Sequence, residues 1–174
     1  MARNRDRLIR RLRDADRFER LRIMYAVVPG ADGSECEVLI HSKVLIVDDT
    51  FVRIGSSNLN NRSEAMDMEC DVAVEAACAG ERRAIAALRD RLLGEHLDAA
   101  PSAVAAAMRH GSLTGAIDRL NRRARGLRPF SIPAGGTAPL PGTALLDPKR
   151  PFSPLRKARE AVAAAVSRLM PGAL

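Results

Sequence analysis

Aromatic side chains are scarce in this sequence of 174 residues: they make up 3% of it, with one Tyr and no Trp. A core built from it must therefore be aliphatic, and the bases of a single-stranded nucleic acid would find almost no rings to stack on. Hydrophobic residues at 47% and charged residues at 28% are typical of a globular protein. The length suits one domain with a core, or a smaller domain followed by a tail.

Cysteines and long apolar runs are also scarce. Cys36, Cys70 and Cys78 are odd in number and lack CxxC spacing, which indicates neither a disulfide framework nor a zinc knuckle and favours a reducing compartment. No run of about 18 uncharged apolar residues could span a bilayer, and the basic N-terminal segment lacks the apolar stretch of a signal peptide. We therefore expect a cytoplasmic protein, with peripheral contact at a membrane surface as the alternative.

Acidic residues are fewer than basic residues. Lys and Arg number 28 against 21 Asp and Glu, which gives a net charge of +7. This excess favours an anionic partner, such as a phosphate ester, a nucleic acid or an acidic membrane surface. A solvated basic surface without a dedicated ligand explains the same numbers equally well.

The hydrophobic periodicity changes along the chain from helical to strand-like and back. Residues 3–20 predict an amphipathic helix, and aliphatic runs then predict strands within 21–28, 35–47, 51–55 and 69–75. Turns are expected at 29–33 and 48–50. Helices are predicted from about residue 80 and near 101–109 and 112–125; the Pro- and Gly-rich residues 127–154 predict an extended connector, and residues 155–169 a last amphipathic helix. This order indicates an α/β fold, or α+β, with a mostly β centre.

The residues that could take part in catalysis or binding lie between His41 and Glu75. Side chains alternate across a strand, so His41 and Lys43 should project from the same face. A fixed cation beside an imidazole argues against a metal ion and favours a bound anion. The turn Gly55-Ser56-Ser57-Asn58 would supply a close backbone approach, a hydroxyl and an amide donor for a phosphate.

A histidine that attacks phosphorus, or protonates a departing oxygen, needs a partner that holds one tautomer. Glu69 is the candidate for this partner, whereas Asp48 lies at the hairpin turn and is expected to be structural rather than reactive. Each residue alone has a plainer explanation as a packed, exposed or turn residue, but the combined spacing favours a site. The predicted catalytic set is His41, Lys43, Asp48 and Glu69; the predicted phosphate-binding set is Lys43, Ser56 and Asn58, with no metal.

His41, Lys43 and Asp48 resemble the HKD signature of the phospholipase D superfamily, and Gly55, Ser56 and Asn58 resemble its GSxN extension. The segments 61–63 (Asn-Arg-Ser) and 67–69 (Asp-Met-Glu) are similar to the phospholipase branch rather than the nuclease branch. Cardiolipin synthases are close competitors, although they usually have Asn-Phe-Glu at 67–69. The resemblance is sharp over about 20–76, is weaker out to residue 97, and fits the C-terminal half of a bacterial enzyme.

The resemblance implies a two-step displacement at phosphorus through a phosphohistidine, without a metal or organic cofactor. The implied substrate is a glycerophospholipid, hydrolysed or transphosphatidylated. The resemblance also implies two HKD motifs for each active site. This sequence has one, because neither His96 nor His110 has a lysine two residues on. Family precedent makes His41 the general acid and a histidine of the second half the nucleophile.

The second motif would come from an identical chain or, as we favour, from a missing N-terminal half. The expected organisation is a phospholipase D-like HKD half-domain at 1–98, with a mixed β-sheet flanked by helices, a helical extension at 99–126, the Pro/Gly-rich connector at 127–154 and a C-terminal helix at 155–174. Two alternatives remain open: a homodimeric nuclease-like phosphodiesterase, with nucleic acid the less favoured partner, and an inactive truncated remnant that binds lipid.

Overall fold

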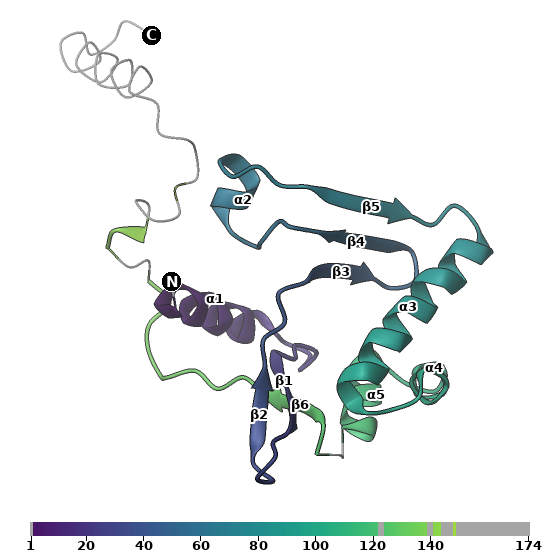
Figure 1. The fold of residues 1–174 in the computed structure, drawn as a ribbon. Coiled ribbons are helices and arrows are strands. Elements are labelled where there is room, and N and C mark those ends of the chain that lie inside the picture. The colour runs from purple at the N-terminus through teal and green to yellow at the C-terminus, as the bar shows by residue number, and fades with distance from the viewer. Residues whose placement is uncertain (1, 122–123, 139–140, 144–147, 149–174) are drawn as a thin grey trace, which may run out of the picture. The chain divides into compact units, whose positions relative to one another are not determined.

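The computed structural model describes residues 2–121, 124–138, 141–143 and 148. Contacts divide the chain into two compact units, Met1–Ser57 with Glu69–Leu140 and Asn58–Met68 with Pro141–Leu174. The described strands and four of the described helices belong to the first unit (Figure 1). The predicted α/β class is confirmed. The helix predicted at 155–169 lies outside the described residues.

The first sheet contains three antiparallel strands in the order β2-β1-β6, with β1 at Met24–Pro29, β2 at Glu35–Val38 and β6 at Gly126–Pro129. Ala26 and Val27 of the central strand are buried. Strand β6 corrects the prediction that the connector begins without regular structure at residue 127. The Asn121 side chain donates to the Leu127 carbonyl (2.7 Å) and accepts from the Leu127 N–H (2.8 Å), so it fixes the start of a strand that Pro and Gly composition concealed.

The second sheet has the order β3-β4-β5, with β3 at Lys43–Val47, β4 at Phe51–Gly55 and β5 at Asp71–Glu75. Both of its strand pairs are antiparallel. The strand-like run predicted at 35–47 is interrupted at 39–42, because β2 and β3 belong to different sheets and the chain must cross between them. The described strands therefore form two antiparallel sheets in place of the single mixed sheet that we expected.

Three helices of the first unit pack on one another: α3 at Ala79–Leu97, α4 at Pro101–Arg109 and α5 at Leu113–Leu120 (Figure 1). Their packing buries an aliphatic cluster, as the lack of aromatic residues requires: Ile85, Leu97, Val104, Ala107, Ala116 and Ile117. The chain reverses tightly after α3, where a Cβ on Gly94 would lie 2.5 Å from the Ala99 carbonyl oxygen. Gly94 therefore permits the close approach of α3 and the loop before α4.

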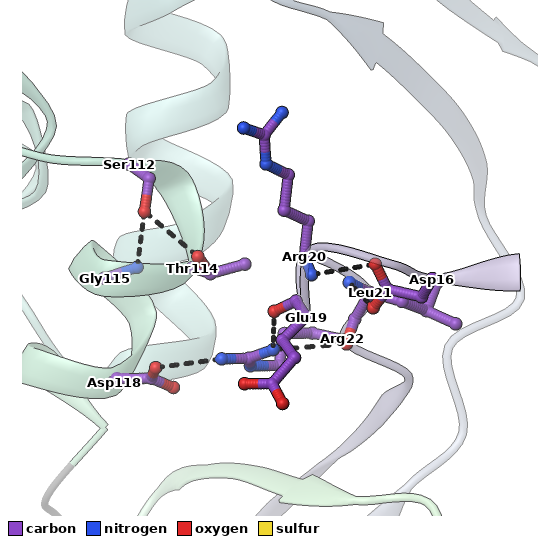
Figure 2. Close-up of polar contacts among 9 residues, drawn as sticks. All are labelled: Asp16, Glu19, Arg20, Leu21, Arg22, Ser112, Thr114, Gly115 and Asp118. Atoms are coloured by element: carbon purple, nitrogen blue, oxygen red, sulfur yellow. Dashed lines mark hydrogen bonds and ion pairs between the residues drawn. The ribbon is translucent and has the colours of Figure 1, made fainter. Parts of the chain in front are cut away.

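Helix α1 (Ala2–Ala15) is joined to β1 by a loop that polar contacts order (Figure 2). Asp16 accepts hydrogen bonds from the N–H groups of Arg20 (3.0 Å) and Leu21 (2.8 Å), and these bonds hold the pKa of its carboxyl below the ordinary value of 3.8. Arg22 forms an ion pair with Asp118 of α5 at 3.3 Å. The loop is thereby tied to the helical layer.

The second unit contains the short helix α2, Asn61–Ala65. Asn60 caps it, because its side-chain oxygen accepts from the Ser63 N–H at 2.8 Å. Arg62 pairs with Asp67 through two contacts, Nε to Oδ2 at 3.2 Å and Nη2 to Oδ1 at 2.8 Å. This bidentate pair closes the segment that leads from the helix towards residue 68.

Candidate active site at one end of the second sheet

The imidazole of His41 and the ammonium of Lys43 are in contact. His41 lies just before β3, and Lys43 is the first residue of that strand. Lys43 Nζ is 3.1 Å from His41 Nε2 and 3.3 Å from His41 Nδ1. Because an ammonium has donors only, it can bond only a ring nitrogen that carries no proton. His41 is exposed and Lys43 is half-buried, so the pair lies at a surface rather than inside a pocket.

The register of the second sheet brings three strand ends into one row. Lys43 of β3 is paired with Gly55 of β4, and Gly55 is paired with Asp71 of β5. The segments 41–43, 55–57 and 69–71 therefore meet at the same end of the sheet. Residues that are up to 30 positions apart in sequence become neighbours through hairpin pairing alone.

Gly55 is required here by close packing rather than by its backbone angles. A Cβ placed on it would lie 1.5 Å from Asp71 Oδ1, 2.4 Å from Asp71 Cγ and 2.7 Å from Asp71 Cα. No side chain fits at these distances, and the last one involves the backbone of the neighbouring strand. The glycine of the turn thus allows the Asp71 carboxylate to lie across the end of β4.

Ser56 and Glu69 form a second contact at this end of the sheet. The Ser56 hydroxyl donates to Glu69 Oε2 at 2.5 Å and accepts from the Cys70 N–H at 3.0 Å. The Ser56 N–H donates in turn to the Cys70 carbonyl at 3.1 Å. The one proton of this hydroxyl is therefore donated to Glu69. The hydrogen bond from Ser56 to Glu69 must break before the hydroxyl can donate to a bound phosphate.

Asp71 is a residue of this region that the sequence analysis missed. Its carboxylate accepts from the Ser57 hydroxyl and from the Ser57 N–H (3.2 Å), and Arg53 Nη2 lies 3.9 Å from its Oδ2. The hydrogen bond from the Ser57 hydroxyl, followed by that from the Ser57 N–H and by the charge of Arg53, lowers the pKa of Asp71. Its position two residues after Glu69 on a strand-like run was the available signal, because both residues then share a face.

The other two predicted residues make different contacts. Asp48 is in the hairpin turn at the opposite end of β3 from Lys43, with a left-handed φ of 52°. Asn58 is the first residue of the second unit, where its N–H donates to Ser63 Oγ (3.1 Å) and its carbonyl accepts from the Asn60 N–H (2.9 Å). The structure thus pairs His41 with Lys43 and Ser56 with Glu69.

Two larger cavities of the first unit lie away from these pairs. One, of about 430 Å³, is lined by β3, the turn after it and the three packed helices; the other, of about 510 Å³, is lined by α1 and residues of 133–138. In the part of the chain that the structure describes, no group of three or more His, Cys, Asp or Glu side chains is arranged to hold a metal ion. None of the described helices has both the length and the apolarity needed to cross a membrane.

An α/β unit with a histidine–lysine pair beside a Gly-Ser turn at the end of an antiparallel sheet has the features of a phospholipase D-like half-domain. The comparison with family models agrees: the model described as "Cardiolipin synthase, PLD-like domain" matches residues 4–90, half of the chain and the whole stretch from His41 to Glu75. The chain therefore belongs to this family, which is a family of phosphodiesterase-type enzymes. No curated protein and no solved structure matches the chain.

Proposed function

We propose that this chain supplies one half of a phosphodiesterase active site that cleaves glycerophospholipids, or transfers their phosphatidyl group to an alcohol, through a phosphohistidine. The observation that carries the proposal is the contact of the Lys43 ammonium with the His41 imidazole, 3.1 Å away, in the row that also holds Gly55. A proton-transferring ring, a fixed cation and a turn with a hydroxyl are what an in-line displacement at phosphorus requires. The family description, which includes a synthase, supports an alcohol as well as water as the acceptor.

In the proposed first step, a histidine nitrogen of a second HKD half forms a bond to phosphorus, and the bond from phosphorus to the head-group oxygen breaks. His41 gives its ring proton to that departing oxygen. In the second step, water or an alcohol attacks the same phosphorus, its proton passes to His41, and the nitrogen–phosphorus bond breaks. Lys43 turns its ammonium from the His41 ring to the phosphoryl oxygens, whose negative charge it stabilises in both steps.

The surface around the sheet supports the need for a second half. Among the described residues β5 pairs with β4 only, so its outer edge is open. On the same face of β3 as Lys43, the apolar side chains of Leu45 and Val47 are 49% and 45% exposed. An open edge and an exposed apolar face favour cover by another segment, which we propose to be the second HKD half, from a further part of the protein or from a second copy.

The test compares wild-type chain, His41→Ala and Lys43→Met with Ser42→Ala, which alters the exposed residue between the two. Head-group release and transfer to added alcohol are measured on phosphatidylcholine and phosphatidylglycerol over a range of protein concentrations. We expect His41→Ala to lower turnover by about 10²–10⁴ and Ser42→Ala to leave it unchanged. Equal turnover by wild type and His41→Ala would refute the role of His41.

The same assay distinguishes the source of the second half and the substrate class. Specific activity that rises with concentration indicates a second copy of this chain. If the chain alone turns nothing over, the ring resonances of His41 are followed while a short-chain phosphatidylglycerol is added below its micelle concentration; a saturable shift, lost in Lys43→Met, supports the site. Cleavage of duplex DNA without cleavage of lipid would replace the lipid substrate with nucleic acid.

A further inference from the structure

A cationic cavity lies in the first unit, outside the HKD motif. It has a volume of about 510 Å³, and three arginines of α1 line it together with the segment 133–138: the lining residues are Arg3, Asp6, Arg7, Arg10, Pro133, Ala134, Gly136 and Ala138. Arg3, Arg7 and Arg10 are spaced at i, i+4 and i+7, so they lie on the same side of the helix. Asp6 is the one carboxylate of the lining, and Arg5 pairs with it at 3.0 Å.

The three arginines differ in what they bind. Arg10 donates from Nε to the Gly136 carbonyl (3.1 Å) and from Nη1 to the Pro133 carbonyl (2.8 Å), so it holds the segment 133–138 against the helix as a wall of the cavity. Arg7 Nε is buried and has no hydrogen-bond partner among the described residues. Arg3 is exposed and, within the same residues, makes no ion pair. Two of the three guanidinium groups are therefore available to a ligand.

A buried guanidinium N–H without an acceptor is unfavourable, and an anion corrects both the missing hydrogen bond and the excess charge. The guanidinium fork matches the oxygens of phosphate, to which it donates two parallel hydrogen bonds. The cavity is large enough for such a group with its waters. The site is thus suited to a phosphate ester that accepts hydrogen bonds from Arg7 and from the exposed Arg3 on the same side of α1.

We propose that this cavity binds the phosphate group of a phosphate ester, independently of the chemistry at His41. The ester is either the head group of an anionic phospholipid or a soluble phosphate compound, and vesicle binding distinguishes the two. Leu8 and Leu12 are 46% and 44% exposed. At 3.6 residues per turn they lie roughly 100° or more around α1 from the three arginines, so they do not flank the cavity and do not identify the ligand.

The first experiment measures phosphate binding to the full-length chain by NMR. Inorganic phosphate is titrated at constant ionic strength, and the arginine Nε–Hε signals are followed in a Lys43→Met background, so that binding beside His41 does not contribute. We expect a saturable shift of the Arg7 signal. In that background Arg7→Gln should weaken phosphate binding about tenfold or more, while the matched control Arg11→Gln, which removes the same charge from an exposed position on the same helix, should leave it within about twofold.

The second experiment measures sedimentation with vesicles of phosphatidylcholine alone, or of phosphatidylcholine mixed with phosphatidic acid. If the ligand is a lipid head group, wild-type chain binds the mixed vesicles and Arg7→Gln loses more of this binding than Arg11→Gln. Phosphate binding without vesicle binding identifies a soluble phosphate compound instead. Arg3→Gln changes an exposed position, so it should leave folding intact while weakening phosphate binding, and Arg7→Lys should bind phosphate better than Arg7→Gln does.

Two results would overturn the proposal. Equal losses in Arg7→Gln and Arg11→Gln would show diffuse charge rather than a site. Binding of duplex DNA that Arg7→Gln abolishes, with vesicle binding unchanged, would assign it to nucleic acid.

Discussion

Replacement of Gly55 by alanine tests the packing on which the candidate site depends. The added Cβ would lie 1.5 Å from Asp71 Oδ1 and 2.7 Å from Asp71 Cα. The carboxylate can rotate away, but it then loses both hydrogen bonds to Ser57. The backbone of β5 cannot rotate away, so the strand must move by about 0.7 Å to bring the second distance to the 3.4 Å of ordinary van der Waals packing.

Such overpacking typically costs about 1–3 kcal/mol, and we expect Gly55→Ala to destabilise the chain by that amount. A protein of this length loses about 3 °C of melting temperature for each kcal/mol. The turn 55–57 should also become more mobile, because Asp71 no longer holds Ser57. Activity should therefore fall together with stability, although Gly55 contributes no functional group.

The assay is thermal and urea unfolding of wild type, Gly55→Ala, Asp71→Ala and the double variant. In the double variant the side-chain clash is gone and only the clash with the backbone of β5 remains, so the two changes should be less than additive. Gly80→Ala is the matched control, since its nearest neighbour would be Cys78 Sγ at 3.6 Å. The packing argument is wrong if Gly55→Ala unfolds at the wild-type midpoint, or if Gly80→Ala costs as much.

Two further predictions concern charge and the core. The pKa of Asp71 lies below its ordinary value of 3.8, so the stability gained from its ionised form is complete above about pH 4 and is lost as the pH falls through the lowered pKa. A carboxyl ¹³C titration should give a midpoint below 3.8 that moves up in Ser57→Ala; equal midpoints in the two proteins would contradict the hydrogen-bond cause. Leu97 is 1% exposed, so Leu97→Ala should lower the free energy of unfolding, measured with urea, by about 2–5 kcal/mol. Leu39 is 91% exposed, and Leu39→Ala should lower it by less than about 0.5 kcal/mol.

The sequence allows prediction of most elements of the first unit because their periodicity is strong. The strands at 51–55 and 71–75 and the helix at 101–109 follow directly from aliphatic spacing. Strand β6 could not be foreseen, since its Gly and Pro suppress the strand signal and its order depends on the Asn121 side chain. The break at 39–42 was hidden for a similar reason: an aliphatic run does not show that its two ends join different sheets.

Among the site residues, spacing alone indicated His41 and Lys43, whose contact needs only two residues in extended backbone. Spacing could not predict which residue bonds Glu69. Glu69 accepts a hydrogen bond from Ser56, 13 positions earlier in the sequence, a contact set by the register of β4 and β5. The sequence analysis missed Asp71 because this residue holds Ser57 in place, and sequence patterns rarely identify a residue that acts through another.

The spacing of the motif follows from the geometry of one hairpin. Five residues of β3, a turn of three and five residues of β4 pair Lys43 with Gly55, which places the ammonium opposite the start of the Gly-Ser turn. One residue more in either strand would send Lys43 to the other face, and a longer turn would shift its partner. Asp48 starts that turn with a φ of 52°, a conformation that Asp tolerates better than most side chains. The hairpin thus gives the interval between the lysine and the glycine a physical cause, and it gives Asp48 a structural reason to stand where it does, at the far end of the strand from the imidazole.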